Sequence, residues 1–189
     1  MGSGISGLYS GTYGAAHGLG EGHSAGRTVP ANMRKSQPYA QSYGVMPDML
    51  EYDKKRGVYS DSNGYSLNPT VTSAQSSIHN GILVDKAGNP MDGAYTYAVK
   101  EDGELVIGKR NGNGRDGKAT PHPTLVGGKN PRVRVAGMVT LSHGRVVKYD
   151  TESGHYKPNA RSIAAADDAF SQLPPTAFHK NFKKDMGRR

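Results

Sequence analysis

The sequence contains no cysteine and no tryptophan among its 189 residues. Without thiols the chain cannot form disulfides or a thiolate zinc site, and a cysteine nucleophile is excluded. No run approaches the roughly 18 apolar residues of a membrane span, and the N-terminus lacks the basic-then-apolar order of a signal peptide. We therefore expect no membrane span and a cytoplasmic location in the producing cell, or export or virion association by a route other than a signal peptide.

Positive charge is in excess, but it lies mainly at the two ends of the chain. The formal net charge is +8. Residues 1–35 carry three Lys/Arg and one Glu, and residues 173–189 carry five Lys/Arg and one Asp, so only +2 remains on residues 36–172. The body should therefore lack the strong positive face of a dedicated nucleic-acid-binding protein. The tail could contact polyanions without specificity, but a solvated tail is the simpler interpretation.

The composition divides the chain into a leader over residues 1–35, a single domain over 36–172 and a basic tail over 173–189. Nine of residues 1–26 are glycine and few are aliphatic, so burial cannot offset the entropy cost of ordering this segment. We expect a flexible, Gly-rich N-terminal arm. The alternative is an arm that becomes ordered across a neighbouring subunit, with its tyrosines as anchors.

Three short helices are expected in the domain. Pro47 gives a favourable first turn to a helix that ends before Gly57. Asn68 is a suitable N-cap for a second helix over residues 68–80, although its Thr and Ser content weakens the prediction. A third helix begins at Asn159 or Ser162 and runs to residue 170.

The rest of the domain alternates short apolar runs with turn residues, which is typical of β-hairpins. Residues 100–104 and 142–144 are the expected hairpin turns. The simplest architecture is a β-meander, so the sequence predicts an α+β fold: a small antiparallel sheet of hairpins with two or three short helices. The expected strands cover residues 82–84, 95–99, 105–107, 132–141 and 145–149.

Two histidines in this β-rich region form the candidate site. A glycine-rich loop over residues 111–120 leads to His122, and loops often carry functional groups on a rigid scaffold. His122 and His155, with Lys109 or Arg110 nearby, could cleave a phosphodiester without a metal, one imidazole acting as base, the other as acid, and the cation holding the phosphate. The candidate substrate-binding residues are Thr124, Gly127, Gly128, Ser153, Tyr156 and Lys157.

A purely structural interpretation of the same residues is open. In it Gly154 supplies a tight turn, His155 bonds a backbone carbonyl and Tyr156 packs in the core. For each histidine alone this interpretation is favoured, and for the pair in one site the two interpretations are balanced.

Other chemistries fit the sequence less well. A metal site would use the two histidines with Asp150 or Glu152, but no close spacing of ligands supports it. ADP-ribosyl transfer would need an acidic residue beside the ribose, for which Glu152 is the best placed. The glycine-rich stretches neither lead into a helix nor contain Gly-Lys-Ser/Thr, so they indicate turns rather than a phosphate-binding loop.

The order of these motifs resembles the domain shared by plant IQ-motif calmodulin-binding proteins and by bacterial effector and toxin-like proteins. In those proteins a His-Ser-Ser and Gly-Gly segment precedes an Ala-Ala-Gly strand and a Ser-Gly-His-Tyr-x-Pro turn. Here Pro123 replaces the first Ser after the histidine, and no Ile-Gln-x-x-x-Arg motif occurs. The resemblance is carried by His122, Thr124, Gly127, Gly128, Ala136, Gly137, Ser153, Gly154, His155, Tyr156 and Pro158.

The resemblance implies a small bacterial effector or toxin-like domain of phage-associated type, with a cognate immunity protein as its partner. Calmodulin binding is not implied, because its motif is missing. No catalytic mechanism comes with the resemblance, and the cofactor requirement stays open. The competing hypothesis is a non-enzymatic virion or assembly protein whose arm and basic tail contact neighbouring virion subunits.

Overall fold

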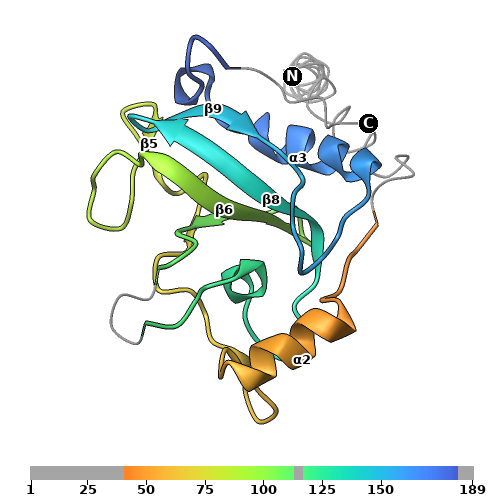
Figure 1. Ribbon diagram of the computed structural model, residues 1–189. Helices are drawn as coiled ribbons and strands as arrows, with labels where there is room; N and C mark the ends of the chain where they lie inside the picture. The colour runs from red at the N-terminus through yellow and green to blue at the C-terminus, as the bar shows by residue number, and fades with distance from the viewer. Residues whose placement is uncertain (1–40, 113–116, 183–189) are drawn as a thin grey trace, which may run out of the picture. The chain divides into compact units, whose positions relative to one another are not determined.

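The computed structural model describes residues 41–112 and 117–182. The predicted N-terminal arm and the last seven residues of the predicted tail lie outside these ranges. At the centre is a five-stranded antiparallel sheet with the order β3-β7-β6-β8-β9 (Figure 1). Together with two α-helices, this sheet confirms the predicted α+β class. Its strands are β3 (Thr72–Ser73), β6 (Gly93–Lys100), β7 (Leu105–Gly108), β8 (Val133–Ser142) and β9 (Arg145–Tyr149).

Both predicted hairpins form, but the prediction of a β-meander is wrong. β6 and β7 pair across the turn at residues 101–104, and β8 and β9 pair across His143 and Gly144. β8, however, pairs with β6 and not with β7. The free edge of β7 is taken by β3, with Thr72 opposite Ile107, so the chain between β7 and β8 crosses to the other side of β6.

The second predicted helix does not form. In its place lie β3 and a separate small hairpin of β4 (Ile78–His79) and β5 (Ile82–Leu83). The Asn68 side chain accepts hydrogen bonds from the backbone and hydroxyl groups of Thr70, and Ser76 and Ser77 donate to the carbonyl of Ser73. Such local side-chain bonds compete with helical backbone bonds, which explains why the capping signal led to a turn.

The other two predicted helices form. α2 (Pro47–Lys55) has proline in its first turn and is followed by the hairpin of β1 (Tyr59–Ser60) and β2 (Gly64–Tyr65). α3 (Ile163–Phe170) follows the 3₁₀ turn η2 (Ala160–Ser162). Within the part of the chain that the structure describes, neither helix is long and apolar enough to cross a membrane.

One face of the sheet is covered by α3 and carries the main core. Tyr97, Tyr149 and Phe170 pack together there, with the Tyr149 and Phe170 rings stacked at 4.1 Å. The chain beyond residue 172, where we expected the tail to begin, continues on this side through η3 (Pro175–Ala177). Leu173 is buried, and Phe182 packs against the same core, so residues 173–182 add to the folded body.

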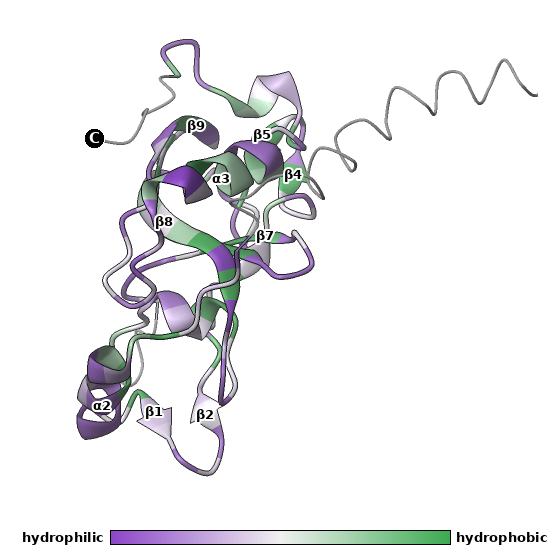
Figure 2. Ribbon diagram, turned by 90° about the vertical axis from the view of Figure 1, so that its right-hand side faces the viewer, coloured by the Kyte–Doolittle hydropathy of each residue, from purple (hydrophilic) through white to green (hydrophobic). Residues whose placement is uncertain are grey.

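The opposite face of the sheet has smaller side chains and less cover. Ala98, Val106 and Ala136 pack there against Leu125 and Tyr156 in a second, smaller core. Leu125 belongs to the 3₁₀ turn η1 (His122–Leu125). In Figure 2, β8 runs between α3 at one end of the body and α2 with β1 and β2 at the other. Because alanines fill little space, this second face leaves room for a cavity.

Candidate functional site

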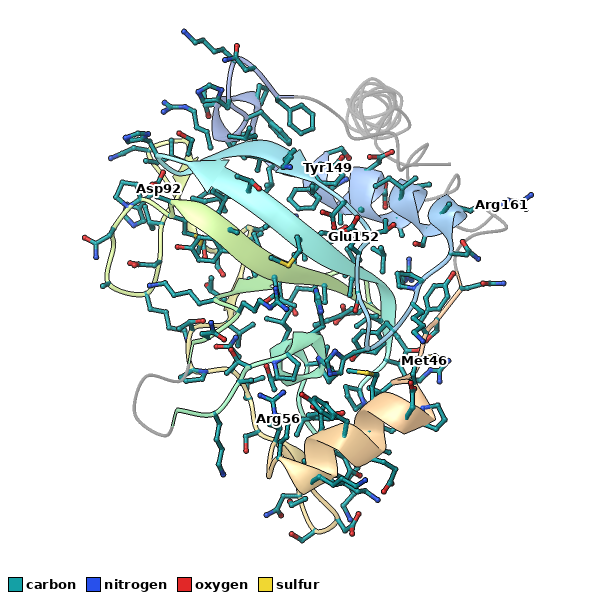
Figure 3. The ribbon with its side chains drawn as sticks, viewed as in Figure 1. Met46, Arg56, Asp92, Tyr149, Glu152 and Arg161 are labelled. Atoms are coloured by element: carbon teal, nitrogen blue, oxygen red, sulfur yellow. The ribbon has the colours of Figure 1, made fainter. Side chains whose placement is uncertain are left out.

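A cavity of about 400 Å³ lies on the second face of the sheet. Residues from six segments line it: α2 with the Arg56 that caps it, β6, the chain after β7, η1, β8 and the chain after β9. Figure 3 shows Arg56 beside α2 and Glu152 closer to β8 and α3. The ionisable or hydroxyl-bearing side chains in this lining include those of Arg56, Arg110, His122, Glu152, Ser153 and His155. The structure therefore brings Arg110, Ser153 and the two predicted histidines together.

His122 is held in one orientation by the central strand. It is only 8% exposed, and its Nε2 lies 2.9 Å from the carbonyl oxygen of Gly137. A carbonyl only accepts, so Nε2 carries the hydrogen and Nδ1 is left as an acceptor. Burial is the main reason that the pKa of His122 falls to about 4; the bond to Gly137 opposes the shift, and the nearby His155 and Arg110 add to it. At neutral pH this ring is uncharged.

The lowered pKa of His122 predicts that the fold loses stability in mild acid. Between about pH 6.5 and pH 4 the unfolded chain binds a proton at this histidine while the folded protein does not. Proton binding to the unfolded state favours unfolding, so we expect a loss of about 3 kcal/mol over this range. Urea unfolding at steps between pH 7 and pH 4 measures it.

Two variants assign this loss to His122. His122→Gln retains an N–H donor for the Gly137 carbonyl but has no titratable ring, so its stability should fall less with acid. His79→Gln, at an exposed position on β4, should keep the full pH dependence. An equal decline in all three proteins would contradict the assignment.

His155 is oriented by a buried carboxylate of α2. Its Nε2 lies 3.0 Å from Oδ2 of Asp53, which also accepts a hydrogen bond of 2.8 Å from the Tyr65 hydroxyl. Asp53 is fully buried, and its Oδ1 has no hydrogen-bond partner among the described residues. Because Nε2 faces the carboxylate, Nδ1 is the nitrogen of His155 left for chemistry. The backbone N–H of Met46 donates to the His155 carbonyl, which ties the same helix to the turn a second time.

Tyr65 is kept as a hydrogen-bond donor in this network. Burial is the largest cause of the rise in its pKa, and the bond to Asp53 raises it further. The phenol therefore stays protonated over the whole working range of pH. Asp53 thus has two fixed donors, one of which is the candidate catalytic ring.

Asp53 and Arg56 are site residues that were not predicted from the sequence. Asp53 belongs to α2 and Arg56 is the residue that caps its C-terminus, and together with Met49 they follow the spacing of one helix face. This face points to the cavity and to His155. The helical spacing was available in the sequence, but nothing in it indicated that the face would meet a turn about one hundred residues later.

The two predicted cations, Lys109 and Arg110, separate in the structure. Arg110 lines the cavity with the histidines. Lys109 lines a different, smaller pocket beside Asp85 and contributes to the lowered pKa of that carboxyl group, after its bonds to backbone N–H groups. Of the two, only Arg110 is placed to act with His122.

Among the described residues, the arginines of the cavity have no acidic partner, since no salt bridge involves Arg56 or Arg110. The guanidinium of Arg56 lies 5.0 Å from the centre of the Tyr52 ring, a cation–π contact between α2 and its C-terminal cap. Both positive charges are therefore available to a bound anion.

Several predicted substrate-binding residues build the scaffold and do not line the cavity. Thr124 is buried, and its hydroxyl donates to the carbonyl of Pro121. Gly127 and Gly128 have φ values of +76° and +81°, which glycine adopts without strain. Gly128 exchanges backbone hydrogen bonds with Tyr65. These residues fix η1 and hold it against β2.

The turn at residues 153–157 has a similar division of roles. Ser153 lines the cavity and accepts a long hydrogen bond of 3.4 Å from the Tyr156 backbone. Tyr156 is buried, with its hydroxyl donating to the carbonyl of Pro131. Lys157 is exposed and has a φ of +41°. Gly154, which we expected to supply a tight turn, does not have a positive φ.

The acidic residues near the site have different surroundings. Oδ1 of Asp150 accepts hydrogen bonds from the backbone N–H groups of Met138 and Glu152, whereas Glu152 lines the cavity. Over residues 41–112 and 117–182, no group of three or more His, Asp or Glu side chains is arranged to hold a metal ion.

No protein-family model matches the chain, and neither a curated protein nor a solved structure matches it.

Proposed function

We propose that the domain is an enzyme that uses its own side chains for acid–base catalysis on a phosphate-bearing substrate, as a nuclease or a transferase of the bacterial effector or toxin-like class. One observation carries the proposal. A single cavity contains two histidines, each with its Nε2 bonded to a protein oxygen, and two arginines that form no salt bridge with a described residue. Such a set can bind a phosphate and move protons beside it.

In this proposal His155 is the general base. Asp53 fixes the ring, so that a proton taken up at Nδ1 creates an imidazolium next to a buried carboxylate. In a catalytic triad a carboxylate likewise positions the base and stabilises its charged form, although there it bonds Nδ1 and the base is Nε2. The imidazolium then returns its proton to the leaving group.

His122 has a different part, because its pKa of about 4 makes it neutral at physiological pH. A neutral ring cannot be the general acid in the first step. Its Nδ1 can instead accept one hydrogen of an attacking water and so orient it, while the other hydrogen is the one that His155 removes. The symmetrical acid and base pair expected from the sequence thus becomes one proton-transferring histidine and one orienting histidine.

Arg56 and Arg110 supply the positive charge. A guanidinium donates two parallel N–H bonds to phosphate oxygens and keeps its charge at every relevant pH. The two groups come from separate segments, the C-terminal cap of α2 and the chain after β7. They can therefore approach a phosphate from two sides and stabilise the charge that builds up in the transition state.

The neighbouring cations Lys109 and Arg110 give a matched test. The full chain is assayed with a chelator present for cleavage of RNA and DNA oligonucleotides and for transfer from nucleoside triphosphates. We expect turnover by the wild type, a loss of about 10- to 100-fold for Arg110→Met, and little change for Lys109→Met, since its side chain lines another pocket.

Two results would count against the proposal. One is the absence of turnover with every phosphate-bearing substrate offered. The other is an equal loss for both variants, which would show that the substitutions act through net charge and not through the cavity.

A further inference from the structure

We propose that the phosphate-bearing substrate of this cavity is a nucleotide, with its phosphate between Arg56 and Arg110, its sugar hydroxyls at Glu152, and its base against Met49 and Met138. This inference rests on the proposed function and specifies the substrate. It follows from the way in which the cavity combines three kinds of side chain. The cationic, acidic and apolar side chains each fit a different part of a nucleotide: the phosphate, the sugar and the nucleobase.

The cationic part selects an anion. Arg56 and Arg110 both line the cavity, and neither forms a salt bridge with a described residue. The Tyr52 ring lies 5.0 Å from the Arg56 guanidinium, so the contact that this side chain does make leaves its charge uncompensated. Guanidinium groups favour phosphate because their planar N–H donors match its oxygens.

The acidic part excludes a bare phosphate as the complete ligand. Glu152 lines the same cavity, and no described residue forms a salt bridge with it. A carboxylate repels an anion, but its two oxygens accept hydrogen bonds from hydroxyl groups. A ligand that presents hydroxyl groups as well as negative charge, as a sugar phosphate does, matches both the carboxylate and the arginines.

The apolar part excludes a sugar phosphate alone. Met49 from α2 and Met138 from β8 line the cavity, and both are only partly buried. Met138 lies in the middle of the sheet, opposite Thr96 on β6, where a side chain is normally covered. Thioethers pack well on aromatic rings, so this uncovered wall fits the flat face of a nucleobase.

The size of the cavity agrees with a single nucleotide. Its volume of about 400 Å³ lies near the lower end of the range for small-molecule sites, about 300 to 1,000 Å³. A longer oligonucleotide would have to extend out of the cavity. The site is then selective for one nucleotide unit, whether free or at the reacting position of a chain.

Binding is tested with the full chain carrying His155→Gln. Glutamine keeps an N–H donor for Asp53 but lacks the imidazole that acts as the general base. Calorimetry compares the four common ribonucleoside 5′-monophosphates with ribose 5-phosphate, the free nucleosides and inorganic phosphate. We expect at least one monophosphate to bind tenfold or more tightly than ribose 5-phosphate and than its own nucleoside. If every monophosphate binds no better than ribose 5-phosphate, or if none binds, the inference is overturned.

Single variants made in the His155→Gln protein test where the nucleobase and the phosphate bind. Met49→Ala should weaken binding of the nucleotide several-fold and leave ribose 5-phosphate unchanged. Arg56→Gln should weaken both ligands, whereas Lys55→Gln, next to it but outside the cavity lining, should weaken neither. Equal effects of Arg56→Gln and Lys55→Gln would overturn the placement of the phosphate.

The result also separates the two proposals. Nucleotide binding without turnover by the wild type would support the inference and refute the catalytic function. Equal turnover of phosphate esters with and without a nucleobase would support the catalytic function and refute the inference.

Discussion

Replacing His155 by glutamine should lower turnover by about two to four orders of magnitude, the usual cost of losing a general base. The ring of His155 is the proton-transferring group in our proposal, because Asp53 holds its Nε2 at 3.0 Å and leaves Nδ1 for the substrate. Glutamine keeps a donor for this carboxylate, so the buried charge does not lose its partner. The measurements are kcat and KM of the full chain, together with growth of a bacterial host during its expression.

The fold must survive for this result to be informative. Far-UV circular dichroism and urea unfolding should show His155→Gln close to wild type. His155→Ala should be less stable, because it leaves Asp53 with Tyr65 as its single donor. His143→Gln, in the exposed β8–β9 turn, serves as the control and should keep full activity.

Two outcomes would remove the catalytic role of His155. The first is a well-folded His155→Gln protein that retains wild-type turnover. The second is a wild-type chain that neither turns over a phosphate-bearing substrate nor slows the growth of the host. The second outcome would leave the virion or assembly hypothesis as the better account of this chain.

Replacing Gly137 by alanine should destabilise the fold by about 4 kcal/mol or more, enough to unfold many domains. A Cβ at this position would lie 2.1 Å from the carbonyl oxygen of Asp150 and 2.8 Å from its carbonyl carbon. These are backbone atoms, and Asp150 is also hydrogen-bonded to Met138 through backbone and side chain. The clash therefore cannot be relieved by turning a side chain.

Gly154→Ala is the matched control for this prediction. Nothing lies within 4 Å of a Cβ built at Gly154, and its φ is not positive, so we expect stability close to wild type. Urea unfolding of both variants at pH 7 compares them. A Gly137→Ala protein as stable as Gly154→Ala would show that the chain after β9 does not pass so close to β8.

The two glycines illustrate where sequence motifs are informative. Both belong to the motifs that carry the resemblance to effector and toxin-like proteins. The motif does not show which of them is constrained by packing. That depends on Asp150, a residue of another segment, so it becomes visible only when β8 and the chain after β9 are placed side by side.

The elements themselves were largely predictable because their signals are local. Alternating apolar residues predicted β6 to β9, and turn residues predicted the two hairpins. Pro47 predicted the start of α2. The failure at Asn68 is also local in origin: the residue does cap a turn, but the hydroxyl groups that follow it bond to nearby carbonyls and favour short strands.

The sequence by itself determined the absence of thiol chemistry, the α+β class and the candidate pair His122 and His155. Only the tertiary structure decided that Arg110 and not Lys109 joins them, and that Asp53 orients a histidine 102 residues further along the chain. The physical reason is that hydrogen bonds and burial between distant segments depend on how the sheet closes, with β8 beside β6. The local pattern of apolar and polar residues does not indicate which strands will pair.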